Sequence, residues 1–121
     1  MLERDIKAQI VDYLQYRGAH VIKIIGHLGR EGERVFKQRP GILDLIACYK
    51  GRFLGVETKT VKGKPTPKQE EEIAAIIRAG GIAIVARCVE DVAAILDEID
   101  KGAYVLASDT TNEFLAERAG R

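Results

Sequence analysis

The sequence predicts a single α/β domain in which helices flank a mixed central sheet. Amphipathic segments with apolar residues at helical spacing alternate with short apolar runs typical of strands, in the order αβββαβα. The length of 121 residues is enough for one hydrophobic core and too short for two. We expect the domain to span residues 1–102, and residues 103–121 to form a tail that holds a short helix or a dimer contact.

The first helix is predicted by a stripe of three apolar residues, Ile6, Ile10 and Leu14, between Glu3 and about Tyr16. A glycine follows the helix, and the run AHVIKII predicts the first strand. The next segment, GHLGREGERVFKQRPG, is too polar and too rich in glycine for regular structure. We therefore expect a long basic loop there.

The next two strands are predicted to form a hairpin. GILDLIAC is typical of a nearly continuous apolar strand, the pair Lys50 and Gly51 of a tight turn, and RFLGVETKT of the strand that returns.

Two further helices are predicted on either side of one more strand. The first begins with Thr66 as N-cap and Pro67 in its first turn, and it runs to Gly80. The run GIAIVAR predicts a short buried strand, followed by a helix from about Val89 to Lys101. The residues expected to face the core are Ile73, Ile76 and Ile77 in the first of these helices and Val92, Leu96 and Ile99 in the second.

The composition argues against several classes of protein. No apolar run approaches the length needed to cross a bilayer, and charges interrupt the N-terminal segment where a signal peptide needs an unbroken apolar stretch. We therefore expect a cytoplasmic protein. Cys48 and Cys88 lie far apart and lack the spacing of a zinc site or a disulfide framework. We expect both to be buried as small apolar residues.

The charge is unevenly distributed along a chain whose net charge is only +1. Residues 17–68 hold twelve Lys and Arg against four Asp and Glu, whereas residues 69–121 hold five against eleven. Clustered cations are typical of a surface that contacts phosphates. A solvated loop would have the same composition, so this alternative stays open.

The hairpin brings two carboxylates together if the Lys-Gly pair forms its turn. Asp44 then lies directly opposite Glu57, and Ile42 lies opposite Lys59. Opposed residues have Cβ atoms about 5 Å apart, where two like charges destabilise a sheet unless something positive lies between them. A hard divalent cation meets this requirement, since it takes carboxylate oxygens and keeps exchangeable waters.

The lysine that follows has a matching orientation. Because side chains alternate along a strand, Lys59 points to the same face as Glu57, where it could orient a water or neutralise a phosphate. Two alternatives remain. A register shifted by one residue would place Asp44 opposite Thr58. Glu57 and Lys59 could also form an exposed ion pair on an edge strand, with Asp44 a partnered polar residue in the core.

The run GILDLIACYKGRFLGVETKTVKGKPTPKQ resembles the core of the virus-type replication-repair nuclease (VRR-NUC) family of the PD-(D/E)xK superfamily. The resemblance extends from the first helix to GIAIVAR and rests on G-x-x-D, E-x-K and K-x-T-x-x-Q in this order. It implies a restriction-endonuclease-like fold and a nuclease that uses Mg²⁺ or Mn²⁺. One departure is Leu43, which stands where the superfamily commonly has proline; proline donates no ligand, so the implied chemistry is unaffected.

The resemblance also implies roles for individual residues. Asp44 and Glu57 would be metal ligands, the Thr58 carbonyl a third ligand, and Lys59 the catalytic lysine. Glu3 resembles the family's acid in the first helix, where it would hold a metal-bound water or a second ion. An acid in a first helical turn is also favoured by the helix dipole alone. Whether one or two ions act stays open.

Gln69 has two interpretations. The resemblance places it near the active site, whereas Thr66 and Gln69 also match the capping box S/T-x-x-E/Q, in which the Gln only satisfies the helix N-terminus. His27 lies in the basic loop without an apparent partner, and we expect it at the surface or on a phosphate rather than in catalysis.

We expect the substrate to be DNA, cut by metal-ion catalysis and recognised by shape rather than by base sequence. The residues expected to contact its phosphates are Lys23, Arg30, Arg34, Lys37, Arg39, Lys62 and Lys64.

Short VRR-NUC proteins encoded by phages or mobile elements are similar to this chain, which implies a Holliday-junction resolvase in a bacterial or phage-infected cell. Symmetric cutting of two strands requires two active sites, hence a homodimer. The tail from Ala103 onward, or Val35 and Phe36, are candidates for its interface. The alternatives are a flap or nicking endonuclease of the same fold, and a DNA-binding module that has lost its activity.

Overall fold

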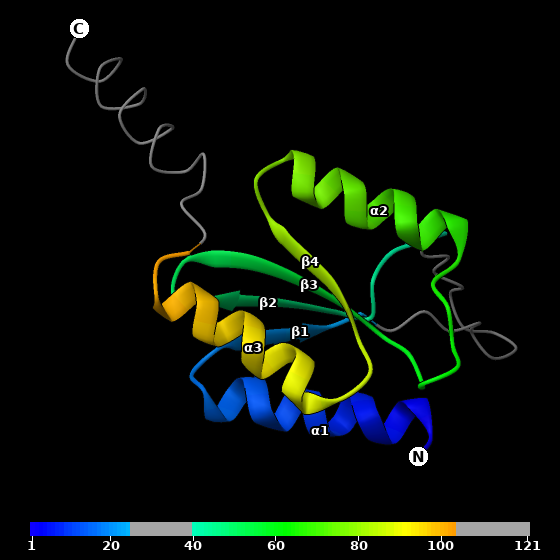
Figure 1. Ribbon diagram of the computed structural model, residues 1–121, viewed down its shortest axis with the longest axis horizontal. Coiled ribbons are helices and arrows are strands. Elements are labelled where there is room, and N and C mark those ends of the chain that lie inside the picture. The colour runs from blue at the N-terminus through cyan, green and yellow to red at the C-terminus, as the bar shows by residue number, and fades with distance from the viewer. Residues whose placement is uncertain (25–39, 104–121) are drawn as a thin grey trace, which may run out of the picture.

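The computed structural model describes residues 1–24 and 40–103 (Figure 1). Its elements follow the predicted order αβββαβα. They are α1 (Glu3–Tyr16), β1 (His20–Lys23), β2 (Leu45–Tyr49), β3 (Arg52–Thr58), α2 (Pro67–Arg78), β4 (Ile82–Ala86) and α3 (Val89–Asp100). The sheet has the order β1-β2-β3-β4; its first three strands are antiparallel, and β4 runs parallel to β3. The predicted mixed sheet is therefore confirmed.

The turn between β2 and β3 has the predicted register. Lys50 and Gly51 both have positive φ angles, 50° and 79°, as a type I′ turn requires. Tyr49 pairs with Arg52, and the ladder continues to the pair of Leu45 with Val56. A two-residue turn of this hand matches the twist of the strands, so the turn fixes the pairing of everything beyond it.

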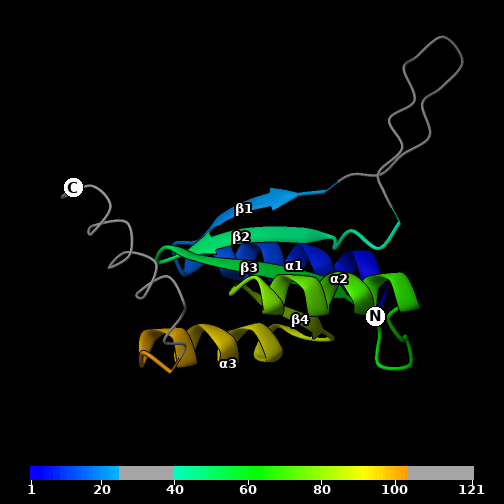
Figure 2. The same cartoon turned by 90° about the horizontal axis from the view of Figure 1, so that it is seen from above.

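Helices cover the sheet from both sides. α1 and α3 pack against one face, and α2 lies across the other (Figures 1 and 2). The main hydrophobic core lies between the sheet and the pair α1 and α3. The predicted inward residues of these two helices, Ile6, Ile10, Leu14, Val92, Leu96 and Ile99, are all buried. None of the helices in residues 1–24 and 40–103 is long and apolar enough to span a membrane.

α2 is less buried than its apolar stripe predicts. Ile73 and Ile76 are only partly buried, and Ile77 is 55% exposed, so the expectation that Ile77 faces the core is wrong. The helix rests on β3 and β4 through Ile76, whose Cδ1 would lie 3.2 Å from a Cβ atom at Gly55. Gly55 has no side chain, so Ile76 packs directly against the strand there. Ile77 is the next residue of the helix and lies beside this contact, where it is exposed.

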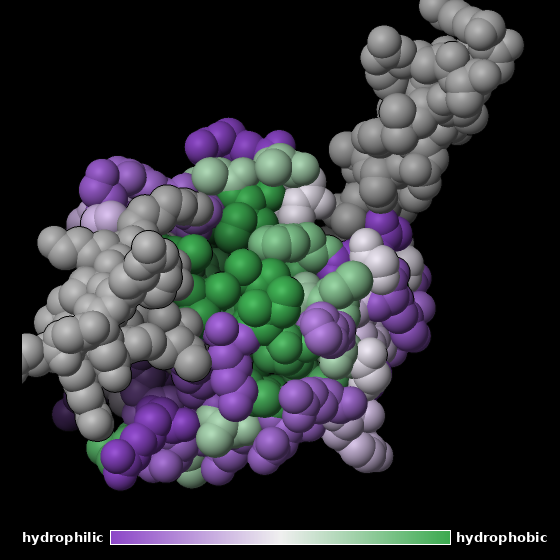
Figure 3. Space-filling model, turned by 180° about the vertical axis from the view of Figure 1, so that it is seen from behind, coloured by the Kyte–Doolittle hydropathy of each residue, from purple (hydrophilic) through white to green (hydrophobic). Residues whose placement is uncertain are grey.

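Both cysteines are exposed, which corrects the expectation that they are buried. Cys48 pairs across the sheet with His20 and Phe53, on the part of the sheet that α2 leaves uncovered. Cys88 is the N-cap residue of α3. The rear side of the molecule shows a broad apolar surface (Figure 3). The expectation of burial rested on the small apolar character of the two cysteines. Whether such a residue is buried depends on where the helices cover the sheet.

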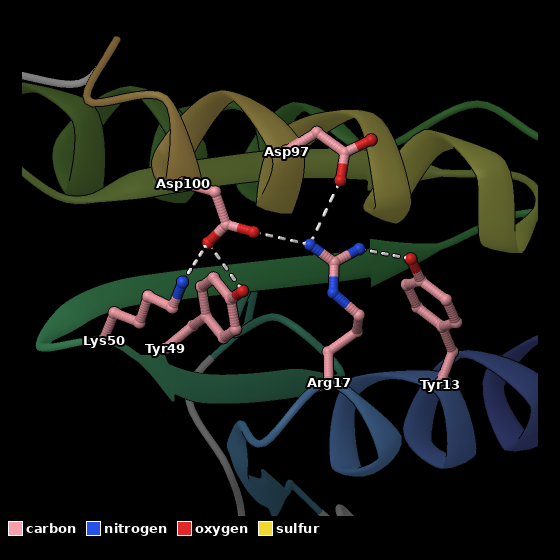
Figure 4. A network of polar contacts seen from close by, with 6 residues as sticks. All are labelled: Tyr13, Arg17, Tyr49, Lys50, Asp97 and Asp100. Atoms are coloured by element: carbon pink, nitrogen blue, oxygen red, sulfur yellow. Dashed lines mark hydrogen bonds and ion pairs between the residues drawn. The ribbon is translucent and has the colours of Figure 1, made fainter.

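A polar network ties α1, the β2–β3 turn and α3 together at one end of the sheet (Figure 4). Its members are Tyr13, Arg17, Tyr49, Lys50, Asp97 and Asp100. Asp100 accepts hydrogen bonds from Arg17 (2.9 Å), Tyr49 (2.7 Å) and Lys50 (2.6 Å). The Arg17 guanidinium also lies over the Tyr49 ring, 5.9 Å from its centre. The network thus joins three elements that are far apart in the sequence.

We predict that Asp100→Asn destabilises the protein in a pH-dependent way. The donors Lys50 and Tyr49 lower the pKa of Asp100 from 3.8 to about 2. A carboxyl with a depressed pKa in the folded state contributes stability above its unfolded pKa and loses it as the pH falls towards the folded pKa. The variant should melt a few degrees below the wild type at pH 7, and the difference should shrink between pH 4 and pH 2.

Thermal melts monitored by circular dichroism measure this difference. Glu98→Gln, which changes an exposed acid in the same turn of α3, is the matched control and should alter the melting temperature little. Equal effects of the two substitutions at pH 7 would show that the network contributes nothing specific.

Candidate active site

Asp44 and Glu57 meet at the end of the sheet opposite the polar network. Asp44 comes directly before Leu45 and Glu57 directly after Val56, and these two neighbours form the last pair of the β2–β3 ladder. The backbone N–H of Asp44 donates to Glu57 Oε2 at 3.2 Å. One carboxylate oxygen of Asp44 accepts from both the backbone N–H and the hydroxyl of Thr58, at 3.1 and 2.7 Å. The predicted proximity of the two carboxylates is present, and both are held by hydrogen bonds.

The predicted ladder does not extend beyond Leu45 and Val56, so Asp44 and Glu57 are close without being a strand pair. β2 begins at Leu45 and β3 ends at Thr58, so Ile42 does not pair with Lys59. The backbone N–H of Lys59 donates instead to the Ala86 carbonyl of β4. The ladder ends because the chain enters β2 through a bend at Asp44.

Glu57 is 1% exposed and lies on a strand that has neighbours on both sides. The alternative of an exposed ion pair on an edge strand is therefore wrong. Burial, together with the nearby charge of Asp44, raises the pKa of Glu57 from 4.5 to about 7. Lys59 opposes this shift, since its ammonium lies 3.5 Å from Glu57 Oε1 and its side chain is 15% exposed. A buried acid with this pKa is an anion only near or above neutral pH.

Glu3 completes an acidic cluster. It lies in the first turn of α1 and offers a carboxylate oxygen that lies, with those of Asp44 and Glu57, in a group whose members are all within 4.8 Å of one another. Carboxylate oxygens so close together repel one another unless a cation or protons intervene. They form a donor set of the kind that Mg²⁺ and Mn²⁺ prefer. The residues present therefore fit a hard divalent ion.

Gln69 caps α2 and also contacts Glu57, so the capping box does not exclude a position beside the acidic cluster. Its Oε1 accepts from the Thr66 backbone N–H at 2.9 Å, and its own backbone N–H donates to the Thr66 hydroxyl at 3.2 Å, which makes the capping box of α2. Its Nε2 donates to Glu57 Oε1 at 2.7 Å. Because Thr66 occupies the amide oxygen, the amide nitrogen faces the buried carboxylate.

The structure describes part of the predicted basic surface. Lys23, Lys62 and Lys64 are exposed, and the last two lie between β3 and α2. The other residues of this prediction, Arg30, Arg34, Lys37 and Arg39, together with His27, Val35 and Phe36, lie outside the described residues.

Arg87 is a residue that the sequence reasoning missed. It follows β4 directly, and its Nη2 donates to the Gly63 carbonyl at 2.7 Å, in the segment that carries Lys62 and Lys64. A cation directly after a buried strand in an α/β chain was the available signal, because ligands of such folds gather at the carboxyl ends of the strands.

We predict that Glu57→Gln stabilises the metal-free protein at alkaline pH. An acid whose pKa is raised by folding costs stability above the folded pKa, here about 7, and the cost disappears as the pH falls towards the unfolded value of 4.5. The shift corresponds to an upper limit on the order of 3 kcal/mol. Urea unfolding in EDTA should show the gain at pH 8 and lose most of it at pH 5. A gain that is independent of pH would contradict this assignment.

We predict that Gln69→Glu separates the two roles of this residue. A Glu keeps the capping box, but it would place a second carboxylate against Glu57 and lose the amide donor. The variant should therefore be less stable than the wild type at pH 8 without metal. In a Glu57→Gln background the same change should cost little, because the repulsion is gone, and urea unfolding of the four proteins measures this coupling. A residue that only caps the helix would show no coupling.

Comparisons with known proteins agree with the architecture. No protein-family model matches the chain, and no curated protein matches it either. Among solved structures, one described as a "VRR_NUC domain" has a TM-score of 0.61 and 23% sequence identity over 78% of this chain and 94% of that chain. The chain therefore has the fold of a VRR-NUC domain, the restriction-endonuclease-like fold that its motifs predict.

Proposed function

We propose that the chain is a metal-dependent endonuclease that hydrolyses phosphodiester bonds in DNA. The observation that carries this proposal is the acidic cluster of Glu3, Asp44 and Glu57, gathered beside Lys59 in a VRR-NUC fold. Elements distant in the sequence converge on it, and burial, together with the charge of Asp44, raises the pKa of Glu57 to about 7. Such an arrangement is typical of a site selected for chemistry rather than for folding.

Each residue of the site has a proposed role. Asp44 and Glu57 bind Mg²⁺ or Mn²⁺ with the Thr58 carbonyl, and Glu3 binds the ion or its water. When bound, the ion supplies Lewis acidity and a water of lowered pKa. Lys59 orients the attacking water and neutralises charge on the phosphate.

Two further contacts keep the ligands in place. Gln69 holds Glu57 through one oxygen and leaves the other oxygen facing Asp44. The Thr58 hydroxyl and backbone N–H hold one oxygen of Asp44, so its second oxygen stays available to a ligand. These contacts fix the carboxylates before substrate binds, which is what an efficient site requires.

Among nucleases, a Holliday-junction resolvase is the form that we propose first, because the motifs of this chain resemble those of phage-type VRR-NUC proteins. This function needs a homodimer, so that two sites cut symmetrically. A flap or nicking endonuclease would use the same site on forks or nicked duplexes. The exposed Lys62 and Lys64 would contact phosphates in either case.

We predict that the protein cuts a labelled four-way junction in Mg²⁺ or Mn²⁺ in preference to fork, flap or linear duplex. Asp44→Ala and Lys59→Ala should each lower the rate more than about 100-fold, because one removes a ligand and the other the group that assists attack. Lys101→Ala, an exposed lysine at the end of α3, is the matched control and should cut normally. Rates are measured by electrophoresis at saturating metal.

The remaining outcomes decide between the hypotheses. Equal cutting of forks would favour a broader structure-selective nuclease. Binding without cleavage in any divalent metal would favour an inactive DNA-binding module, and cleavage that survives both substitutions would show that the proposed site is wrong.

A further inference from the structure

A cavity of about 570 Å³ opens at the end of the sheet that also holds the acidic cluster. Its walls come from α1, from the segment after β3 and from the start of α3, which lie at the same end of the sheet (Figure 1). Thr60 in the wall is the residue after Lys59, and Ile6 is one helical turn after Glu3. Its volume lies within the range of about 300–1,000 Å³ usual for small-ligand sites. Among the residues given a role above, Lys62 lines this cavity, whereas the proposed metal ligands and Lys59 do not.

One wall of the cavity is a turn that is held in place. The Gly63 N–H donates to the Thr60 carbonyl at 3.0 Å and closes the turn. Arg87 donates to the Gly63 carbonyl at 2.7 Å and ties the turn to the end of β4. The turn therefore presents its two central residues, Val61 and Lys62, on a fixed backbone.

The walls combine apolar surface with positive charge. Val61 is 83% exposed although it is a large apolar residue, so the core does not explain its presence. Val89 adds apolar surface. Lys62 and Arg87 supply two cations against one acid, Glu90, and a guanidinium has further donors beyond the one that holds Gly63. A nucleotide has the complementary pair of features, an apolar base and an anionic phosphate.

We propose that this cavity holds an unpaired nucleotide of the DNA substrate next to the phosphate that is cut, with its base against Val61 and its phosphate on Lys62 and Arg87. A paired base is stacked inside the duplex and cannot turn into a recess between two helices without the cost of unpairing. At a branch point the base is already unpaired, so no free energy is needed to unpair it. The cavity would thus give the proposed nuclease, on which this inference rests, its preference for branched over continuous DNA.

The two exposed cysteines allow a direct test in the unaltered protein. Cys88 lines the cavity, whereas Cys48 lies on β2, on the part of the sheet that α2 leaves uncovered, and serves as an internal control. The protein is alkylated with N-ethylmaleimide in Ca²⁺, which keeps DNA intact, and each cysteine is followed by mass spectrometry. A fork with unpaired arms should slow alkylation of Cys88 several-fold, and a continuous duplex of the same length should not. Neither DNA should protect Cys48. Equal reactivity of Cys88 with and without the fork would overturn the inference.

Substitution of Val61 provides a second, kinetic test. Val61→Ser should raise the KM for forked DNA several-fold without a matching rise for nicked duplex. Val61→Ile, which keeps an apolar side chain, should leave the KM for forked DNA at the wild-type value. The matched control is Ile77→Ser, which changes an exposed apolar residue of α2 that does not line the cavity. It should alter neither KM value. Cleavage with unchanged KM in Val61→Ser would overturn the inference and leave the nuclease proposal standing. Absence of cleavage by every protein would overturn the nuclease proposal itself, and the alkylation experiment would still report where DNA binds.

Discussion

The site depends on two carboxylates that are forced together at a buried strand end. Asp44 and Glu57 share a hydrogen bond, and the pKa of Glu57 rises to about 7 because its surroundings offer too little compensation for a charge. Lys59 and Gln69 offset part of the free-energy cost of a charge on buried Glu57. A divalent cation beside the two carboxylates would stabilise the charge on Glu57 further, which would couple metal binding to folding.

Local patterns predicted the parts of the structure that local interactions determine. The Lys50–Gly51 turn fixed the register of the hairpin, and this register placed Asp44 beside Glu57. The capping box of α2 was equally visible. Capping the helix and lying near the site are not mutually exclusive for Gln69, because an amide has a donor end and an acceptor end. Thr66 occupies the acceptor end and Glu57 the donor end, so one side chain makes both contacts.

Features that depend on packing between distant elements could not be predicted in this way. The position of Glu3 follows from how α1 lies against α3 and the sheet. The pairing of β4 with β3 decided that Glu57 lies on an inner strand, although the order of elements was known. The exposure of Ile77 and Cys48 depends on how much of the sheet α2 covers. In each case the sequence defines the surface of an element but not the neighbour that it meets.

The polar network and the acidic cluster lie at opposite ends of the sheet, and α1 connects them. Arg17, directly after the C-terminal end of this helix, is bound to α3 through Asp97 and Asp100 (Figure 4). Glu3, in its first turn, joins the acidic cluster. The helix has 14 residues and is therefore about 20 Å long. Because a packed helix is rigid over this length, anchoring its C-terminal end also restricts where Glu3 can lie. A network with no contact to the site thus helps to hold the third carboxylate within reach of the other two.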